Sequence, residues 1–339
     1  MTNPATEIAE VEAHPVTAAE EPVIAGKSPT QIAFERLRHD KVAVVCAIVI
    51  AVLVLASAFA PLISRLMGIT PFVDGPNALD TVYVTDSYNM PLPEFGPPSG
   101  GLNWPHVLGI APRTATDNFA TLLYGMRNSL FISIVATVIT TTIGLVVGLA
   151  SGFSRGWLDR VLSFVSDLFF AFPFILFAIA LAPMIVVKFR SDEDALARAQ
   201  FVSLIVILSI LSWMGLARLI RGQVFSLRER EFVLAAQVIG ASTPRILFKE
   251  IMPNLVATMV VVISMSIPGF IAAEVGLSFL GLGLTDSPSM GQMIQAANPY
   301  YDTYPLYLWA PVATVVILVL ALNLVGDSIR DAFDPKTRR

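Results

Sequence analysis

Six long apolar stretches alternate with polar segments along the chain. A helix that crosses a bilayer needs about 20 mostly apolar residues. Each stretch reaches or approaches that length, the fourth being the shortest at 17 residues: Val42–Ile63, Leu130–Ala150, Val161–Val187, Phe201–Ala217, Leu255–Phe279 and Leu306–Val325. The pattern predicts an all-α polytopic membrane protein with six transmembrane helices. Pro173 and Pro268 fall inside two spans, where neighbouring helices can satisfy the freed carbonyl groups.

The Lys and Arg residues between the stretches indicate an orientation. With six spans, both ends of the chain lie on one side of the membrane. Of the 22 Lys and Arg residues, 16 fall in segments on that side. Because Lys and Arg near a span resist translocation, we expect both termini in the cytoplasm.

The same pattern divides the chain into five regions. Residues 1–30 are predicted to form a disordered cytoplasmic tail, because Ala, Glu, Pro and Thr dominate there and apolar anchors are few. Residues 31–63 hold an amphipathic lead-in and the first span, 64–127 a long extracytoplasmic loop, 128–330 the core transmembrane domain, and 331–339 a cytoplasmic tail. Surface loops as long as 64–127 are typically functional. Its acidic residues suggest a docking or gating surface: Asp74, Asp80, Asp86 and Glu94.

Composition narrows the function classes. Apolar residues make up 55% of the chain and charged residues 14%, whereas a soluble domain carries about a quarter charged residues. The basic residues are scattered and form no stripe, so no nucleic-acid partner is expected. The single cysteine, Cys46, allows no disulfide within the chain. The three histidines are far apart in sequence, and we expect no metal site.

One cytoplasmic segment, the coupling loop of residues 218–254, is neither apolar nor loop-like. Its second half reads "EFVLAAQVIGASTPRILFKEIMP" (Glu231–Pro253). Residues with high helix propensity predict one helix over Ser226–Ile239. Gly240 predicts a turn, and a second short helix is expected over Arg245–Ile251, ending at Pro253. Ala235 and Ala236 would give the first helix a low surface that another protein could approach closely. The residues alone leave two interpretations open: an ordinary cytoplasmic loop, or a docking helix for a partner.

The loop resembles the signature loop of permease subunits in binding-protein-dependent, ATP-driven importers. Its usual form is E-A-A, three residues, G, nine residues and I-x-L-P. Here Ala235, Ala236, Gly240 and Pro253 stand in register, whereas Leu234, Glu250 and Met252 depart from the pattern. An acid–aromatic pair before the alanines, here Glu231–Phe232, resembles the peptide-transport branch.

Further stretches resemble the C-type subunit of oligopeptide and dipeptide permeases, over about residues 32 to 336. They are "LLYGMRNSL" (Leu122–Leu130), "SDLFFAFPF" (Ser166–Phe174), "ARLIRGQVFSLREREFV" (Ala217–Val233), "GLSFLGLGL" (Gly276–Leu284) and "LNLVGDSIRDAFDP" (Leu322–Asp334). The segment His106–Asp117 departs from the family pattern, with Thr116 in the position of an arginine and one extra residue.

This resemblance implies a permease that forms half of a peptide translocation path in a prokaryotic cell membrane, with the fold of type I importers. It also implies a homologous B-type permease, two cytoplasmic ATPase subunits and an extracytoplasmic substrate-binding protein as partners. No phosphate-binding loop occurs in the sequence, so ATP and Mg²⁺ are expected in the ATPase subunits and the chain is not expected to be an enzyme. The residues implied in ATPase coupling are Glu231, Phe232, Ala235, Ala236, Gly240, Ala241, Ser242 and Pro253.

Polar residues inside the spans are candidates for lining the path, because exposing them to lipid is costly. They are Asp167, Ser264, Ser266, Glu274 and Asn323. Packing between helices is the competing interpretation for each. Two alternative functions remain open at this point: the permease of a nickel importer with the same architecture, and a self-sufficient secondary transporter. Two observations argue against the secondary transporter. It would not explain the large helical cytoplasmic loop, and the sequence lacks the matched pair of broken helices that such transporters carry in their two halves.

Overall fold

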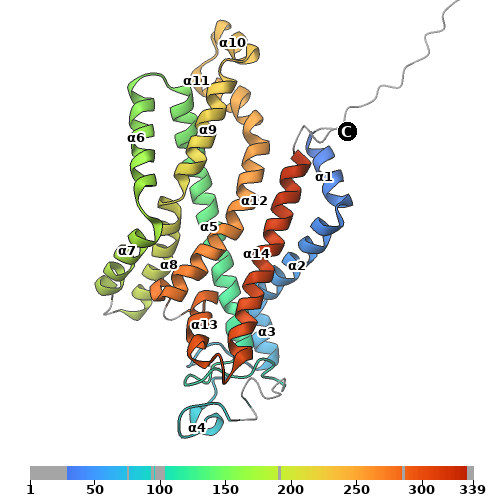
Figure 1. The fold of residues 1–339 in the computed structure, drawn as a ribbon, viewed down its shortest axis with the longest axis vertical. Coiled ribbons are helices and arrows are strands. Elements are labelled where there is room, and N and C mark those ends of the chain that lie inside the picture. Colours follow the sequence, from blue (N-terminus) through green and yellow to red (C-terminus); the bar gives the residue numbers. More distant parts are fainter. Residues whose placement is uncertain are drawn as a thin grey trace, which may run out of the picture.

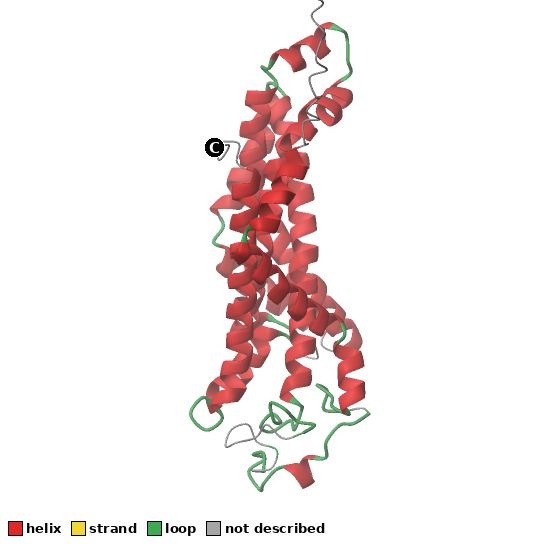
Figure 2. Ribbon diagram, turned by 90° about the vertical axis from the view of Figure 1, so that its right-hand side faces the viewer, coloured by secondary structure: helices red, strands yellow, loops and turns green. Residues whose placement is uncertain are grey.

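The computed structural model describes residues 29–74, 76–92, 95, 104–189, 192–284 and 287–333. Most of the expected tail of residues 1–30 therefore lies outside the described residues. Helices dominate what is described, and they run lengthwise through an elongated bundle (Figures 1 and 2). In chain order they are α1 (Pro29–His39), α2 (Lys41–Ala58), α3 (Ala60–Met67), α4 (Thr81–Val84), α5 (Asn118–Phe153), α6 (Trp157–Ala171), α7 (Phe174–Phe189), α8 (Glu193–Ile210), α9 (Trp213–Leu227), α10 (Glu231–Val238), α11 (Thr243–Arg245), α12 (Met252–Leu277), α13 (Met290–Ala297) and α14 (Pro305–Phe333), with π-helical turns η1 (Ile246–Ile251) and η2 (Ser278–Leu282) and a 3₁₀ turn η3 (Asn298–Tyr300).

Five helical stretches among the described residues are long and apolar enough to cross a membrane, and the pair α6–α7 would make a sixth if it counts as one span. The pair bends by 82° where Pro173 interrupts it. Proline has no N–H for the helical ladder and disfavours helical geometry in the residue before it. The expectation of an all-α polytopic protein with about six spans is confirmed.

Several helix ends differ from the sequence expectation. The second span was expected from Leu130, but α5 begins at Asn118, because the Asp117 carboxylate accepts a hydrogen bond from the Ala120 amide and caps the helix. The first span is interrupted at Phe59, between α2 and α3. The fourth span is far longer than predicted: α8 and α9 together give an apolar stretch over Ala195–Leu227, with a break at Leu211–Ser212.

The predicted helix pair in the coupling loop is partly wrong. The expected helix over Ser226–Ile239 is divided, because α9 continues to Leu227 and α10 starts at Glu231. The expected second helix does not end at Pro253. Its residues form η1, which runs directly into α12. Pro253 therefore lies within a continuous helical run, in the first turn of α12, and not at the end of a helix.

Close approach between α5 and α9 forms the centre of the bundle. Gly144, Gly148 and Gly152 recur every four residues on one face of α5 and touch Leu216, Ile220 and Val224 of α9. A Cβ atom on Gly148 would lie 2.6 Å from the Cβ of Ile220 and 2.8 Å from the Ala217 carbonyl oxygen. Small residues at this spacing let membrane helices pack backbone to backbone.

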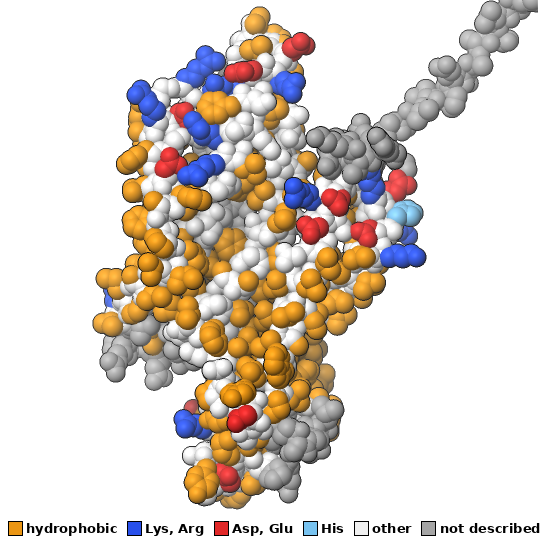
Figure 3. Space-filling view, viewed as in Figure 1, with side chains coloured by type: hydrophobic (Ala, Val, Ile, Leu, Met, Phe, Trp, Pro, Cys, Tyr) orange, Lys and Arg blue, Asp and Glu red, His pale blue; other side chains and the backbone are white. Residues whose placement is uncertain are grey.

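Apolar side chains cover the middle of the molecular surface, and charged ones gather toward the end that carries α10 and around α1 (Figure 3). The start of α1 and the end of α14 lie at that same end (Figure 1). At the opposite end, the segment between α3 and α5 folds over a small cluster of Val84, Ile110 and Ala115. This distribution fits a bundle whose middle is surrounded by lipid.

Candidate functional site

The coupling loop stands out from one end of the bundle, with α10 at its tip (Figure 1). It connects two of the spans directly, since it begins within α9 and runs through α10, α11 and η1 into α12. A force on α10 therefore acts on both α9 and α12. This connection gives the loop the geometry of a lever, whatever binds to it.

Two backbone hydrogen bonds close the end of α10. The Ala241 amide donates to the Ala236 carbonyl oxygen at 3.0 Å, and the Gly240 amide donates to the Gln237 carbonyl oxygen at 3.0 Å. This is the Schellman pattern, and Gly240 has the left-handed φ of +83° that it requires. The unusual turn expected at Gly240 is present. A residue with a Cβ atom would be strained there.

The two alanines of the loop face different surroundings. Ala235 is exposed, whereas Ala236 and Ala241 are half-buried and pack against the chain's own apolar cluster around Val233, Ile246 and Ile251. Ala236 thus holds α10 against the end of the bundle, and Ala235 alone of the pair presents a low surface to a partner. Glu231, Ser242 and Pro253 are also exposed.

Exposed apolar side chains lie on the same tip, and of these the sequence analysis named only Phe232 as a coupling residue. Val238 is 88% exposed and Ile239 is 85% exposed, beside Leu234 at 47% and Phe232 at 41%. Their exposure at the end of the bundle is a signal that a partner covers them. The sequence offered a hint, since apolar residues continue to the end of α10 where a purely solvated helix would have polar ones.

Three arginines in the first part of the coupling loop hold the end of α9 against its neighbours. Arg221 makes a two-pronged ion pair with Asp159 of α6, at 2.7 and 3.0 Å. Arg218 pairs with Asp167 of α6 at 2.6 Å, and Arg228 donates to the Gly152 carbonyl oxygen of α5 at 3.2 Å. Paired guanidinium and carboxylate groups of this geometry fix orientation as well as charge.

The five intramembrane polar candidates separate into two groups. Asp167 is engaged with Arg218, and the fully buried Glu274 accepts a hydrogen bond from the Ser278 hydroxyl at 2.7 Å. Ser264 lies where α12 approaches Gly326 of α14, and Asn323 is exposed on α14. Of the five, only Ser266 lines the central cavity, which lies between α5, α7, α9 and α12.

The cavity has a volume of about 400 Å³ and opens on one side of the bundle at the helix breaks. Residues of α5, α7, α9 and α12 and of the break between α8 and α9 form its wall, and they include no charged side chain: Thr140, Thr141, Phe174, Leu211, Ser212, Leu216, Val262, Ser266, Gly269, Phe270 and Ala273. Both spans attached to the coupling loop contribute to this wall. Movement of the loop would therefore change its shape.

The divergent segment His106–Asp117 is part of the folded region between α3 and α5. Nδ1 of His106 lies 2.8 Å from a carboxylate oxygen of Asp117, and both side chains are buried. The other oxygen of Asp117 caps α5, as described above. The segment thus anchors the region between α3 and α5 to the start of α5. Loops predominate at that end of the bundle (Figure 2).

Comparison with known proteins agrees with this architecture. Residues 141–339 match the family "Binding-protein-dependent transport system inner membrane component", and residues 28–91 match the "N-terminal TM domain of oligopeptide transport permease C". The oligopeptide transport system permease protein OppC of Bacillus subtilis is 33% identical over 90% of this chain and 88% of its own length. Its counterpart in Escherichia coli is 34% identical over 93% and 94%, respectively.

A solved structure shares the fold. It is an inward-facing crystal form of the MetNI methionine ABC transporter, with a TM-score of 0.50, 20% identity, and coverage of 63% of this chain and 96% of that one. The expected fold of type I importers is thereby confirmed. On the family match and the two relatives, the chain belongs to the binding-protein-dependent transport system inner membrane components.

Proposed function

We propose that the chain is the C-type permease subunit of an ATP-driven importer of peptides. The relatives that cover about nine-tenths of it carry peptide permease names. A second, homologous permease subunit would complete the path on the open side of the cavity. ATP and Mg²⁺ would belong to two cytoplasmic ATPase subunits, and an extracytoplasmic binding protein would deliver the peptide.

The exposed apolar tip of α10 carries this proposal. Val238 and Ile239 are almost fully exposed, and packing within the chain does not account for two apolar side chains at these positions. The Schellman turn holds both residues in a fixed position. A groove on an ATPase subunit would cover them together with Ala235. Closure of the ATPase pair would push α10, and α9 and α12 would shift between two discrete packings, giving alternating access.

The cytoplasmic placement of α10 follows from the same proposal. Both termini would then lie in the cytoplasm of a prokaryotic cell, with the segment between α3 and α5 outside its plasma membrane. The charge distribution supports this, because the end that carries α10 also carries Arg155, Arg228, Arg245 and Lys249.

Replacing Val238 or Ile239 by Asp tests the docking surface. Either change leaves the interior of the chain untouched, so insertion and folding should match the wild type. The buried partner surface would lose an apolar contact and gain an unpaired charge, and we expect a loss of about 2 kcal/mol or more, or about 30-fold, in ATPase affinity. Ala235→Glu should act in the same direction through overpacking.

The measurement is co-purification of the ATPase subunits, followed by peptide-stimulated ATP hydrolysis in proteoliposomes. Glu231→Ala serves as the control, since an exposed charge at the rim contributes little. If the Asp variants retain both ATPase binding and stimulated hydrolysis, α10 is not the docking element and the proposed function loses its support.

A further inference from the structure

The wall of the central cavity is mostly apolar, carries several hydroxyl groups and has no charge. Its eleven lining residues include four hydroxyl groups and no Asp, Glu, Lys, Arg or His: the hydroxyls are those of Thr140 and Thr141 on α5, Ser212 between α8 and α9, and Ser266 on α12. Arg218, Arg221 and Asp167 line a separate small pocket, together with Ser151 and Ser163. Charge is thus present in the bundle and is kept out of the cavity.

Helix irregularities gather at the same place. Phe174 directly follows the bend between α6 and α7, Leu211 and Ser212 form the break between α8 and α9, and Gly269 follows the proline inside α12. Backbone groups lose helical partners at such breaks, and a membrane tolerates this where the backbone lines a water-filled cavity or is buried in protein. The Thr140 hydroxyl meets one such group, the Ser209 carbonyl oxygen, at 3.5 Å.

The hydroxyl groups of the cavity wall can form further hydrogen bonds with a bound substrate. Ser266 donates to the Val262 carbonyl oxygen at 2.7 Å and keeps its lone pairs as acceptors. In the described part of the chain, the hydroxyls of Thr141 and Ser212 make no hydrogen bond. A hydroxyl can rotate to donate or accept, so it suits both the N–H and the C=O groups of a peptide.

We propose that this wall contacts the transported peptide through its backbone, and that its neutrality lets peptides pass with little dependence on side-chain charge. Every residue of a peptide offers the same backbone groups, apart from the missing N–H of proline. A fixed charge in the wall would instead retain peptides of opposite charge and repel those of like charge. Passage requires binding weak enough to release the substrate, which neutral hydroxyls provide. This inference rests on the proposed function as a peptide importer.

A charge added after folding tests the inference without risking misfolding. Thr141→Cys and Ser266→Cys are made separately in a chain whose Cys46 is replaced by Ser, with cysteine-free partner subunits. The assembled transporter is treated during turnover with a methanethiosulfonate reagent carrying either a trimethylammonium or a sulfonate group. Uptake of two pentapeptides, AAKAA and AAEAA, is then compared. Thr142→Cys is the matched control, because Thr142 neighbours Thr141 but is exposed away from the cavity lining.

We expect the two adducts to change the uptake ratio of the peptides in opposite directions. The cationic adduct should lower AAKAA relative to AAEAA by about threefold or more, and the anionic adduct should do the reverse, because charges a few ångströms apart interact more strongly than thermal energy. The control adducts should leave the ratio unchanged. Any preference of the binding protein cancels, since the same binding protein is used throughout.

Two results would overturn the inference. One is an unchanged ratio in verified adducts at both cavity positions, whatever happens to the overall rate. The other is failure of both cysteines to react during turnover, which would show that the second permease subunit or lipid fills the cavity. If the unmodified transporter imports neither peptide and its ATPase does not respond to loaded binding protein, the proposed function itself fails. The two failures are therefore distinguishable.

Discussion

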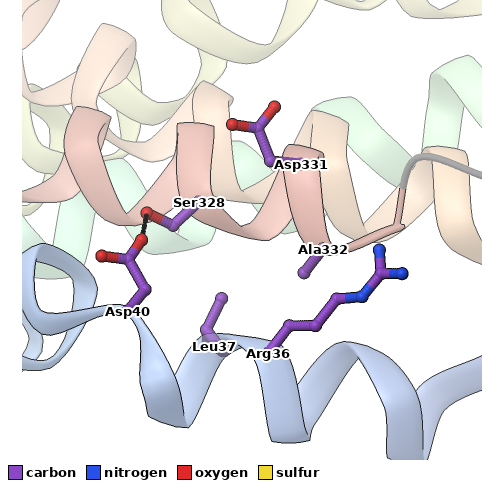
Figure 4. A pocket seen from close by; sticks show the side chains of 6 residues that line it. All are labelled: Arg36, Leu37, Asp40, Ser328, Asp331 and Ala332. Atoms are coloured by element: carbon purple, nitrogen blue, oxygen red, sulfur yellow. Dashed lines mark hydrogen bonds between the residues drawn. The ribbon is translucent and has the colours of Figure 1, made fainter. Parts of the chain in front are cut away.

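At the scale of single residues, Asp40 shows how one side chain joins distant parts of the chain. Its carboxylate accepts hydrogen bonds from the Val42 and Ala43 amides and so caps α2. It also accepts one from the Ser328 hydroxyl of α14 at 2.7 Å (Figure 4). The Ser328 hydrogen bond, followed by those of the amides, holds the pKa of Asp40 below its ordinary value of 3.8. The first span and the last are thus tied together at the end that carries the coupling loop.

This contact should depend on pH. Because the folded-state pKa of Asp40 is depressed, its stabilising effect is fully present above pH 3.8 and is lost as the pH falls through the lower folded value. Ser328→Ala removes the main cause of the shift, so the cap should weaken at a higher pH than in the wild type. Hydrogen exchange of the first turn of α2, compared between the two proteins at each pH from 6 to 3, measures this. Ser328→Thr keeps a hydroxyl and should behave as wild type; equal protection in Ser328→Ala and wild type at every pH would refute the interpretation.

At the scale of elements, the glycines of α5 determine how closely α9 approaches. Gly148→Ala would force a methyl group onto Ile220 and the Ala217 carbonyl oxygen, at a cost of about 1–3 kcal/mol from overpacking. Gly222→Ala, at a position on α9 with open space around it, should be neutral or stabilising by up to about 1 kcal/mol, because alanine favours a helix. Thermal unfolding of the two variants in detergent separates them. A Gly148→Ala variant as stable as wild type would mean that α5 and α9 are not held by this contact.

The same elements show what the sequence can and cannot predict. Hydropathy located the spans, because lipid imposes their length and composition. It misplaced their ends, since the Asp117 cap starts α5 well before the apolar residues begin, and α9 continues to Leu227, past the predicted end of the fourth span at Ala217. The four-residue spacing of Gly144, Gly148 and Gly152 was visible in the sequence and could have indicated the α5–α9 contact.

The candidate site was predictable only in part, for a related reason. The turn at Gly240 could be predicted, because the left-handed φ that ends the helix favours glycine and so depends on the local sequence. The cavity depends on which faces of α5, α9 and α12 meet. Ser266 is on the face of α12 that lines the cavity, whereas Ser264 is on the face that approaches Gly326 of α14. A polar residue in an apolar stretch therefore identifies a candidate, and tertiary packing decides whether it lines the cavity.

At the scale of the whole molecule, the two ends have different chemistry. One end carries α10, the start of α1 and the end of α14 (Figure 1). The other carries the folded segment between α3 and α5, anchored by the buried pair of His106 and Asp117. An apolar girdle separates them (Figure 3). A transporter needs this polarity, because the proposed ATPase and binding protein act from opposite sides of the membrane.

Single-cysteine labelling can establish which end faces the cytoplasm. In a chain whose Cys46 is replaced by Ser, Val238→Cys and Tyr88→Cys place one thiol at each end, where the native side chains are 88% and 81% exposed. Because the predicted topology assigns 16 of the 22 basic residues to the segments on the same side as the coupling loop, a membrane-impermeant maleimide should label Tyr88→Cys in intact spheroplasts, and Val238→Cys only after permeabilisation. The unsubstituted Cys46→Ser chain controls for background labelling. The reverse pattern would place α10 outside the cell, where no cytoplasmic ATPase could bind it. ATP hydrolysis could then not change the shape of the cavity by moving α10.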